Sequence, residues 1–247
     1  MPNLQFILPQ KTIRWLVIWI LLAINIGWII LALLNRELAV RLTLDDGIIQ
    51  WAQFIFLLLT AFYCLRIVLG YRIFYGDKLI KYGFFALFAL TLVVAFEEIS
   101  WGQRIFNIRT PDAIKTLNIQ NEINFHNLVF FHRHRHWLLL LFGIAGLTLI
   151  HLNTNKYRID ERFLFFSPPD FFRLAFSLIL ISGIALELAY IYLSLSAESM
   201  TKVFRFWAGR YSEIGELGVS ITAFSYAAYE FNSLFFQNIH NVIKRSQ

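Results

Sequence analysis

Residues 82–104, YGFFALFALTLVVAFEEISWGQR, change abruptly from an apolar segment to a polar motif. Residues 82–96 carry no charge, whereas Glu97 and Glu98 follow directly and Arg104 closes the motif. The apolar part is typical of a membrane-spanning helix, which needs about 20 mostly apolar residues. Charged groups at or near membrane depth are unfavourable, so they usually face the protein interior and mark a functional site. The stretch therefore predicts a transmembrane helix that ends in a functional site.

The whole chain has the composition of a membrane protein. Of its 247 residues, 58% are hydrophobic and 15% are charged, whereas an ordinary soluble domain carries about a quarter charged residues. We predict one integral membrane domain over residues 1–247, with an all-α fold that forms a polytopic transmembrane helical bundle. About six transmembrane helices are expected, together with short interfacial helices near 111–118 and 202–210. The predicted spans are residues 13–34, 47–69, 79–101, 127–152, 171–196 and 213–236.

The net charge of +6 predicts lipid contacts rather than nucleic-acid binding. Lysine and arginine are spread over every connecting segment, and basic loops beside apolar spans contact anionic lipid headgroups and set the orientation. We therefore expect membrane lipids as partners and no nucleic acid, while protein partners are unknown. A slight excess of basic residues favours both termini on the inside, which places the region between Glu97 and His126 on the outer face.

A second polar patch, NIQNEINFHN, occupies residues 118–127. On a helix, Asn118, Glu122 and His126 would share a face because they are spaced by four residues. A carboxylate next to an imidazole can hold a metal or orient the ring for acid–base chemistry. The alternative is a solvated loop with an incidental histidine. In the first patch, Glu97 and Arg104 would share a face if the helix continued to Arg104. The alternative for this patch is a helix that ends at the membrane interface.

If the two patches meet, they form one candidate site. The predicted catalytic groups are the ionisable side chains of both patches: Glu97, Glu98, Arg104, Glu122 and His126. The predicted substrate-binding residues are the amide and aromatic side chains around them: Trp101, Gln103, Asn118, Gln120, Asn124 and Asn127. The predicted metal ligands are Glu98, Glu122 and His126, a set that suits a divalent zinc, iron or manganese ion.

Three further features contain ionisable side chains. Glu187 lies in the middle of the predicted span 171–196, so we expect it to be protonated or hydrogen-bonded, to a tyrosine or amide on another span. It is also a candidate protonation site for transport. Glu230 is a weaker case of the same kind. The tract HRHRH at residues 132–136 predicts a basic segment at the membrane interface that contacts lipid phosphate. A metal site is disfavoured there because the two arginines would repel a cation.

The sequence EEISWGQ at 97–103, followed by N-x-Q-x-E-x-N-x-H-N at 118–127, resembles an uncharacterised family of prokaryotic multi-pass membrane proteins. The likeness covers about thirty residues, and the flanking spans match only as hydrophobic helices. The resemblance implies a prokaryotic cytoplasmic (inner) membrane and implies that the two patches form one unit. It implies no reaction.

Three functions are compatible with these patterns. The first is a membrane-embedded enzyme that acts on a lipid or lipid-linked substrate by carboxylate and histidine acid–base or metal chemistry. The second is a proton-coupled transporter or carrier, with Glu187 and the Glu97–Glu98 pair as protonation sites. The third is a non-catalytic subunit of a membrane complex. The sequence contains no Gly-rich phosphate loop and no Gly-x-Ser-x-Gly elbow, which disfavours nucleotide-driven transport and serine-triad hydrolysis.

Overall fold

The computed structural model describes residues 10–44, 47–74, 78–103, 105–118, 122–125, 127–154, 166–195 and 198–245. All regular elements among these residues are helices, apart from an isolated β-bridge between Asn118 and Leu128. The long helices are α1 (Gln10–Leu34), α3 (Ile48–Phe74), α4 (Lys78–Glu98), α6 (Val129–Thr154), α8 (Arg173–Leu195) and α9 (Glu198–Arg245). The short ones are α2 (Arg36–Thr43), α5 (Asp112–Lys115) and the 3₁₀ turns η1 (Ser100–Gly102) and η2 (Asp170–Phe172). The predicted all-α fold is confirmed.

Within the described residues, five segments are long and apolar enough to cross a membrane: Trp15–Leu34, Arg36–Gly70, Lys78–Glu98, His136–Asn153 and Asp170–Tyr192. They overlap the first five predicted spans, so the structure supports a membrane protein. The sixth predicted span, 213–236, lies inside α9, a 48-residue helix that is not one of the five. A sixth crossing therefore stays a prediction.

The two predicted interfacial helices differ from expectation. Residues 202–210 belong to α9 and do not form a separate helix. The helix expected at 111–118 is reduced to the four residues of α5. A single turn leaves most of its backbone groups without intrahelical partners, so α5 depends on the contacts of the surrounding loop.

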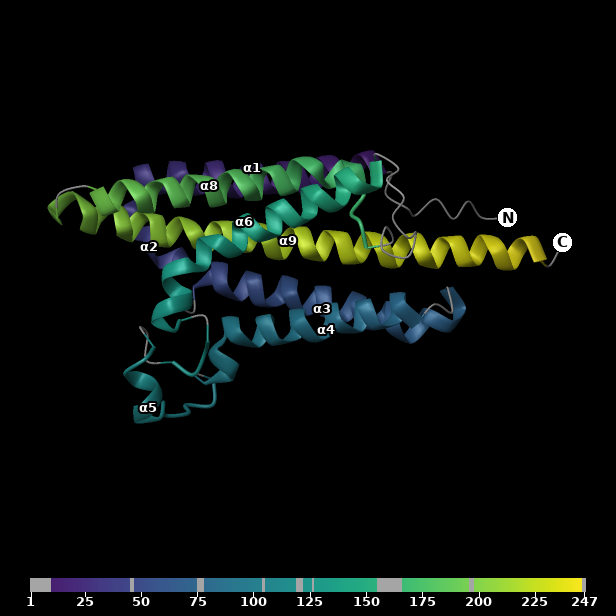
Figure 1. Cartoon of the computed structure of the whole chain (residues 1–247), viewed down its shortest axis with the longest axis horizontal. Helices are drawn as coiled ribbons and strands as arrows, with labels where there is room; N and C mark the ends of the chain where they lie inside the picture. Colours follow the sequence, from purple (N-terminus) through teal and green to yellow (C-terminus); the bar gives the residue numbers. More distant parts are fainter. Residues whose placement is uncertain are drawn as a thin grey trace.

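Helix α9 occupies the centre of the bundle, between the α3/α4 pair and the α1, α6 and α8 helices (Figure 1). It packs against α3 and α8 and also contacts α1, α2 and α6. All three clusters of buried hydrophobic side chains include residues of α9, namely Ala208, Leu217, Ile221, Ala227 and Leu234. The neighbouring helices therefore cover α9, the least apolar of the long helices.

Polar side chains connect α9 to the helices around it. The Tyr211 hydroxyl donates to Asn25 Oδ1 on α1 at 2.7 Å and lies 3.3 Å from Ser182 Oγ on α8. On the opposite side, Gln53 Nε2 of α3 donates to the Glu213 carbonyl oxygen at 2.8 Å. Gln53 is fully buried. Because hydrocarbon offers no hydrogen bonds, polar side chains at this depth are expected to find partners on other helices.

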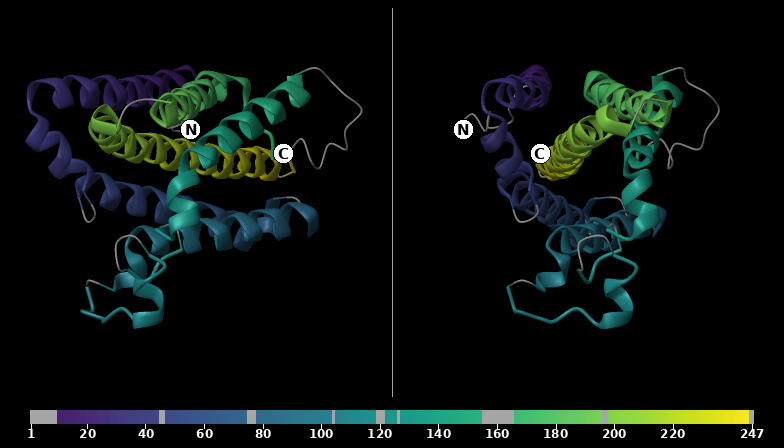
Figure 2. Two further views of the ribbon diagram at one scale, coloured as in Figure 1. Left: turned by 60° about the vertical axis from the view of Figure 1, so that its left-hand side comes forward. Right: turned by 90° about the vertical axis from the view of Figure 1, so that its left-hand side faces the viewer.

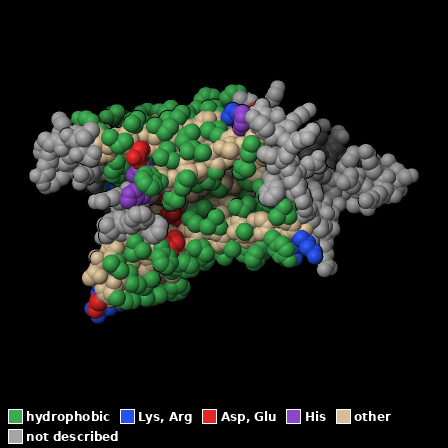
Figure 3. Space-filling model, viewed as in Figure 1, with side chains coloured by type: hydrophobic (Ala, Val, Ile, Leu, Met, Phe, Trp, Pro, Cys, Tyr) green, Lys and Arg blue, Asp and Glu red, His purple; other side chains and the backbone are tan. Residues whose placement is uncertain are grey.

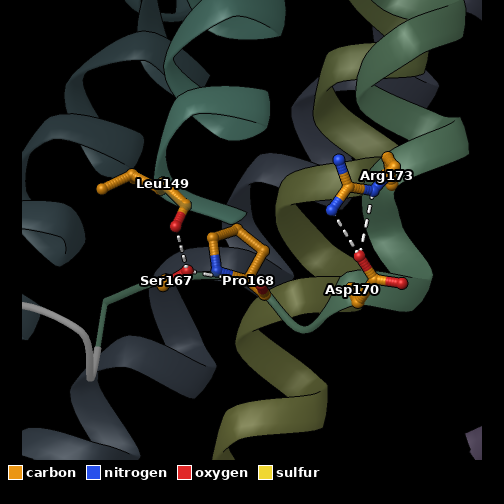
Figure 4. Close-up of polar contacts among 5 residues, drawn as sticks. All are labelled: Leu149, Ser167, Pro168, Asp170 and Arg173. Atoms are coloured by element: carbon orange, nitrogen blue, oxygen red, sulfur yellow. Dashed lines mark hydrogen bonds and ion pairs between the residues drawn. The ribbon is translucent and has the colours of Figure 1, made fainter. Parts of the chain in front are cut away.

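The segment that leads into α8 is fixed by polar contacts at its start (Figure 4). Ser167 Oγ donates to the Leu149 carbonyl oxygen of α6 at 2.7 Å. Arg173 then binds Asp170 through two nitrogens, at 2.6 and 2.9 Å from the same carboxylate oxygen. These contacts join the end of α6 to the first turn of α8.

Glycines allow α6 and α8 to approach closely. A Cβ added at Gly143 of α6 would lie 2.8 Å from Leu180 Cβ and 2.9 Å from Leu180 Cα. A Cβ added at Gly183 of α8 would lie 3.0 Å from the backbone nitrogen of Leu140. Small residues at such crossings are typical of membrane helix pairs, in which van der Waals packing drives association.

Gly143→Ala is expected to destabilise the bundle by about 1–3 kcal/mol, because the added methyl meets the Leu180 backbone and forces the helices apart. The matched control is Gly27→Ala on α1, where the added Cβ would have nothing within 4 Å. Thermal unfolding in detergent, followed by intrinsic fluorescence, measures both changes. Equal midpoints for the two variants would contradict the close packing of α6 and α8.

Candidate functional site

The connection between α4 and α6 folds into a lobe at one end of the bundle (Figures 1 and 2). The described part of the lobe comprises residues 99–103, 105–118, 122–125 and 127–128, with α5 in its middle. The first turn of α1 and the last turn of α9 lie at the opposite end (Figure 1). Which end faces the cytoplasm stays a prediction.

The lobe begins with a left-handed turn. Helix α4 ends at Glu98, and Ser100, Trp101 and Gly102 have φ angles of 48°, 56° and 74°. Non-glycine residues rarely adopt positive φ, and each such residue costs on the order of 1–3 kcal/mol unless surrounding contacts fix it. The helix therefore ends before residue 101, the predicted end of the span, and the helical alignment of Arg104 with Glu97 does not apply, because the chain changes direction at Ser100.

Glu97 connects the end of α4 to the second polar patch. Its side chain is only 7% exposed. Oε1 accepts a hydrogen bond from Trp101 Nε1 at 2.6 Å, and Oε2 accepts one from the Phe125 backbone N–H at 2.6 Å. The Trp101 ring also stacks on Phe96, with ring centroids 5.8 Å apart. Both carboxylate oxygens thus help to hold the lobe against the helix end.

Glu122 lies at the centre of the buried network and is 4% exposed. Its Oε2 accepts hydrogen bonds from Ser100 Oγ at 2.5 Å, Asn124 Nδ2 at 2.9 Å and Asn127 Nδ2 at 3.3 Å. Asn118 Nδ2 in turn donates to Asn124 Oδ1 at 2.9 Å. Hydrogen bonds to a charged acceptor are roughly twice as strong as those between neutral groups. Glu122 therefore orders side chains from both ends of the lobe.

Gln103 connects two further segments of the lobe. Its Nε2 donates to Thr110 Oγ1 at 2.5 Å, and its Oε1 accepts from the Ile123 backbone N–H at 2.6 Å. Gln103 and Thr110 are both buried. The amide thus has a donor and an acceptor role inside the lobe, which fixes its orientation.

The two polar patches meet, but not by the geometry expected from helical spacing. Residues 122–125 are non-helical, and Asn118 lies in the β-bridge with Leu128, so the predicted alignment of Asn118 with Glu122 on one helix face is wrong. Helix α4 packs mainly along α3, and α6 mainly along α8. The patches therefore meet through contacts between the lobe and the end of α4.

The described residues include all but three of the predicted site residues. The network brings together Glu97, Trp101, Gln103, Asn118, Glu122, Asn124 and Asn127. Glu98, the last residue of α4, is partly buried. Arg104, Gln120 and His126 lie outside the described residues.

A metal site is not visible in the described part of the chain. No group of three or more His, Cys, Asp or Glu side chains there is arranged to hold a metal ion. Because His126 lies outside that part, the predicted ligand set of Glu98, Glu122 and His126 stays a prediction. The described contacts of Glu122 are with hydroxyl and amide donors.

Glu187 pairs with a histidine rather than with the expected tyrosine or amide. Its Oε2 lies 2.5 Å from His136 Nε2 and accepts from Trp137 Nε1 at 3.1 Å. The His136 ring stacks on Tyr190, with centroids 4.8 Å apart. His136 is buried, so for this member of the histidine tract the predicted contact with lipid phosphate is wrong.

Helical spacing placed Ser100 in one polar group with Glu97 and Trp101, but it predicted neither the left-handed backbone at Ser100 nor the pairing of His136 with Glu187. Ser100 stands in a motif without a turn signal other than Gly102, so its left-handed backbone had no clear precursor in the sequence. His136 is separated from Glu187 by 50 residues, and helical spacing says nothing about pairing across helices. Comparison of the chain with protein-family models, curated proteins and solved structures finds no match.

Asn124→Asp hardly changes the shape of the side chain, but it should lower the stability of the lobe at neutral pH. The substitution replaces the Nδ2 donor, 2.9 Å from Glu122 Oε2, by an oxygen that repels the carboxylate. An uncompensated buried charge costs about 3–5 kcal/mol. Because one shared proton restores a donor between two carboxyls, the loss should shrink as the pH falls.

Hydrogen exchange of the lobe in detergent micelles, measured by mass spectrometry between acidic and neutral pH, checks this expectation. The matched control is Asn107→Asp, since Asn107 is exposed and its φ of 51° is tolerated by aspartate. Lobe protection in Asn124→Asp that equals the control at every pH would show that Glu122 does not organise the lobe.

Proposed function

We propose that this membrane protein is an enzyme of the prokaryotic inner membrane that acts on a lipid or lipid-linked substrate by acid–base chemistry. The observation that carries the proposal is the hydrogen bond from Ser100 Oγ to Glu122 Oε2. It lies in a buried polar network that starts at the last turn of an apolar helix. A polar site at that level is within reach of the lipid headgroups and of the upper part of the acyl chains.

The contacts of Glu122 support a role as a general base. A general base must lie within hydrogen-bond reach of the hydroxyl whose proton it accepts, and Ser100 Oγ is 2.5 Å from Glu122 Oε2. Asn124 Nδ2 donates to Ser100 Oγ at 2.8 Å as well as to the carboxylate. The same carboxylate can accept a proton from Ser100 or from a substrate hydroxyl that takes its place.

Glu97 occupies a different environment, as expected for a pair of acids with separate roles. Its oxygens are held by the Trp101 indole and the Phe125 backbone. Trp101 is 44% exposed, so one side of the ring holds Glu97 in place while the other can contact an apolar part of the substrate. In this proposal Glu97 positions the substrate-facing tryptophan and Glu122 accepts the proton.

A metal version of this site would use Glu98, Glu122 and His126. Carboxylate and imidazole ligands suit zinc, iron or manganese, and a bound divalent ion would act as a Lewis acid toward a headgroup oxygen. The described contacts concern hydroxyl and amide donors around Glu122, and they favour the acid–base version.

Glu122→Gln should abolish turnover while the fold is kept. Glutamine can still accept the Ser100 and Asn124 hydrogen bonds but cannot take up the proton, and general-base catalysis contributes on the order of 10²–10⁴-fold. The assay compares wild type and variant in proteoliposomes made with native lipid extract, and mass spectrometry follows each lipid and lipid-linked species. The matched control is Glu37→Gln, a carboxylate on α2 that is 76% exposed.

Equal conversion by Glu122→Gln and wild type would reject Glu122 as the base, provided that both unfold at the same temperature. No change of any lipid species by wild-type protein would favour the non-catalytic subunit. Elemental analysis of the same preparations separates the two enzyme versions. Stoichiometric metal that Glu122→Gln loses would replace acid–base chemistry with metal chemistry.

A proton-coupled carrier is the second candidate, and the His136–Glu187 pair favours it. An ionisable pair between two membrane helices, such as α6 and α8, is a functional hypothesis by default. The alternative role of the pair is a structural link between α6 and α8, since Trp137 donates to Glu187 and Tyr190 stacks on His136.

Glu187→Gln should leave thermal stability nearly unchanged if the pair is structural, because an amide oxygen can still accept from Trp137. Glu187→Leu should then lower stability by about 1–3 kcal/mol, since the donors lose their acceptor. Thermal unfolding measures both variants, and a pH-gradient flux assay in proteoliposomes measures transport. Loss of a proton-linked flux in a stably folded Glu187→Gln protein would establish the carrier instead.

A further inference from the structure

The lobe projects sideways from the bundle as well as lying at its end. In all three ribbon views it extends beyond the α3/α4 pair, away from α9 and the other helices (Figures 1 and 2). It starts at Glu98, where the apolar segment Lys78–Glu98 ends. The bilayer around α4 therefore ends at about the level of the lobe, and the lobe lies next to lipid on its outward side.

The surface of the lobe is unusually apolar for a connection between helices. Six large hydrophobic side chains are exposed on it: Trp101, Ile105, Phe106, Ile108, Leu117 and Phe125. In the space-filling view, hydrophobic side chains occupy much of the visible face of the lobe and continue onto the α3/α4 pair (Figure 3). A contiguous apolar surface of this kind marks a membrane or protein contact.

Charged side chains gather at the outer tip of the lobe, away from the bundle (Figure 3). The lobe contains an exposed pair, in which Lys115 Nζ lies 2.6 Å from Asp112 Oδ1, and the exposed Arg109. The hydrogen bond and charge of Lys115 lower the pKa of the Asp112 carboxyl, which stays ionised at neutral pH. The lobe thus has a largely apolar outer surface around its buried polar network, and exposed charges at its outer tip.

We propose that the lobe is an interfacial membrane anchor: it lies in the headgroup region and inserts Ile105, Phe106 and Ile108 at the boundary with the acyl chains. Aromatic and aliphatic side chains favour this boundary, while basic side chains remain among lipid phosphates. The occupant of the apolar surface is therefore lipid, because the surface continues that of two membrane helices and carries its charges at the far edge.

The anchor determines how molecules reach the buried network. Phe125 is exposed on the lobe while its backbone N–H bonds to Glu97, so the lipid-facing surface and the network share a residue. Lipid that surrounds the anchor would lie beside the network, so we expect molecules to reach the network laterally from the bilayer. The membrane contact itself does not depend on any chemistry at Glu122.

Site-directed fluorescence quenching in nanodiscs tests the anchor. Cys64, the free cysteine of the described residues, is buried, so a cysteine introduced at position 106 can be labelled selectively with an environment-sensitive dye. Ile105→Cys provides a second position in case Phe106→Cys disturbs the turn at Gly102. The matched control is Asp112→Cys, since Asp112 is 92% exposed in the same lobe. Unsubstituted protein reports background labelling of Cys64.

Labels at 105 and 106 should be quenched by lipids that carry a nitroxide near the top of the acyl chain and should be shielded several-fold from aqueous iodide. The label at 112 should show the reverse pattern. Iodide access at 105 and 106 equal to that at 112 would overturn the proposal. If the labels at 105 and 106 are shielded from both quenchers in nanodiscs that hold one chain, the proposal also fails, because the lobe then packs against protein and not against lipid. Neither outcome depends on enzymatic turnover.

Discussion

Hydrocarbon offers no hydrogen bonds, so each polar group at membrane depth is driven to find its partner inside the protein. This constraint accounts for the arrangement of the helices. The five apolar segments can face lipid, whereas α9 carries polar side chains such as Tyr211, Ser212 and Ser220, whose hydroxyls have hydrogen-bond partners within the bundle. It therefore lies in the centre, where Tyr211 and Gln53 connect it to three other helices.

The same constraint explains why the acids at the end of α4 do not simply face water. Glu97 follows an apolar segment directly, and the structure surrounds it with an indole and a backbone N–H. Glu122 comes from the other side of the lobe and gathers a hydroxyl and two amides. The bonds to these carboxylates offset the strain of the left-handed turn at Ser100 and Trp101. This strained and buried arrangement is the one to which we assign the proposed chemistry on a membrane substrate.

Much of the fold could be predicted from the sequence, because length and apolar composition identify membrane helices with little help from tertiary structure. The central position of α9 could not, since it depends on which polar residues find partners on other helices. At the site, the cost of leaving Glu97 and Glu98 without partners beside an apolar helix predicted that the two patches meet. Helical spacing gave the wrong geometry for Asn118 and Glu122, because hydrogen bonds within the lobe override local helix preference. The pairing of His136 with Glu187 joins two helices, and no local pattern encodes it.

The place of α9 in the chain has a consequence for biosynthesis. Helix α9 follows all five apolar segments in sequence, so the ribosome completes it after they have entered the membrane. Until then the faces of α3 and α8 that later contact α9 must be covered by lipid or by an insertion factor, and Gln53 lacks its final acceptor on α9. At 48 residues and 1.5 Å per residue, α9 is about 72 Å long. Its arrival therefore joins the α3/α4 pair to the closely packed α6/α8 pair.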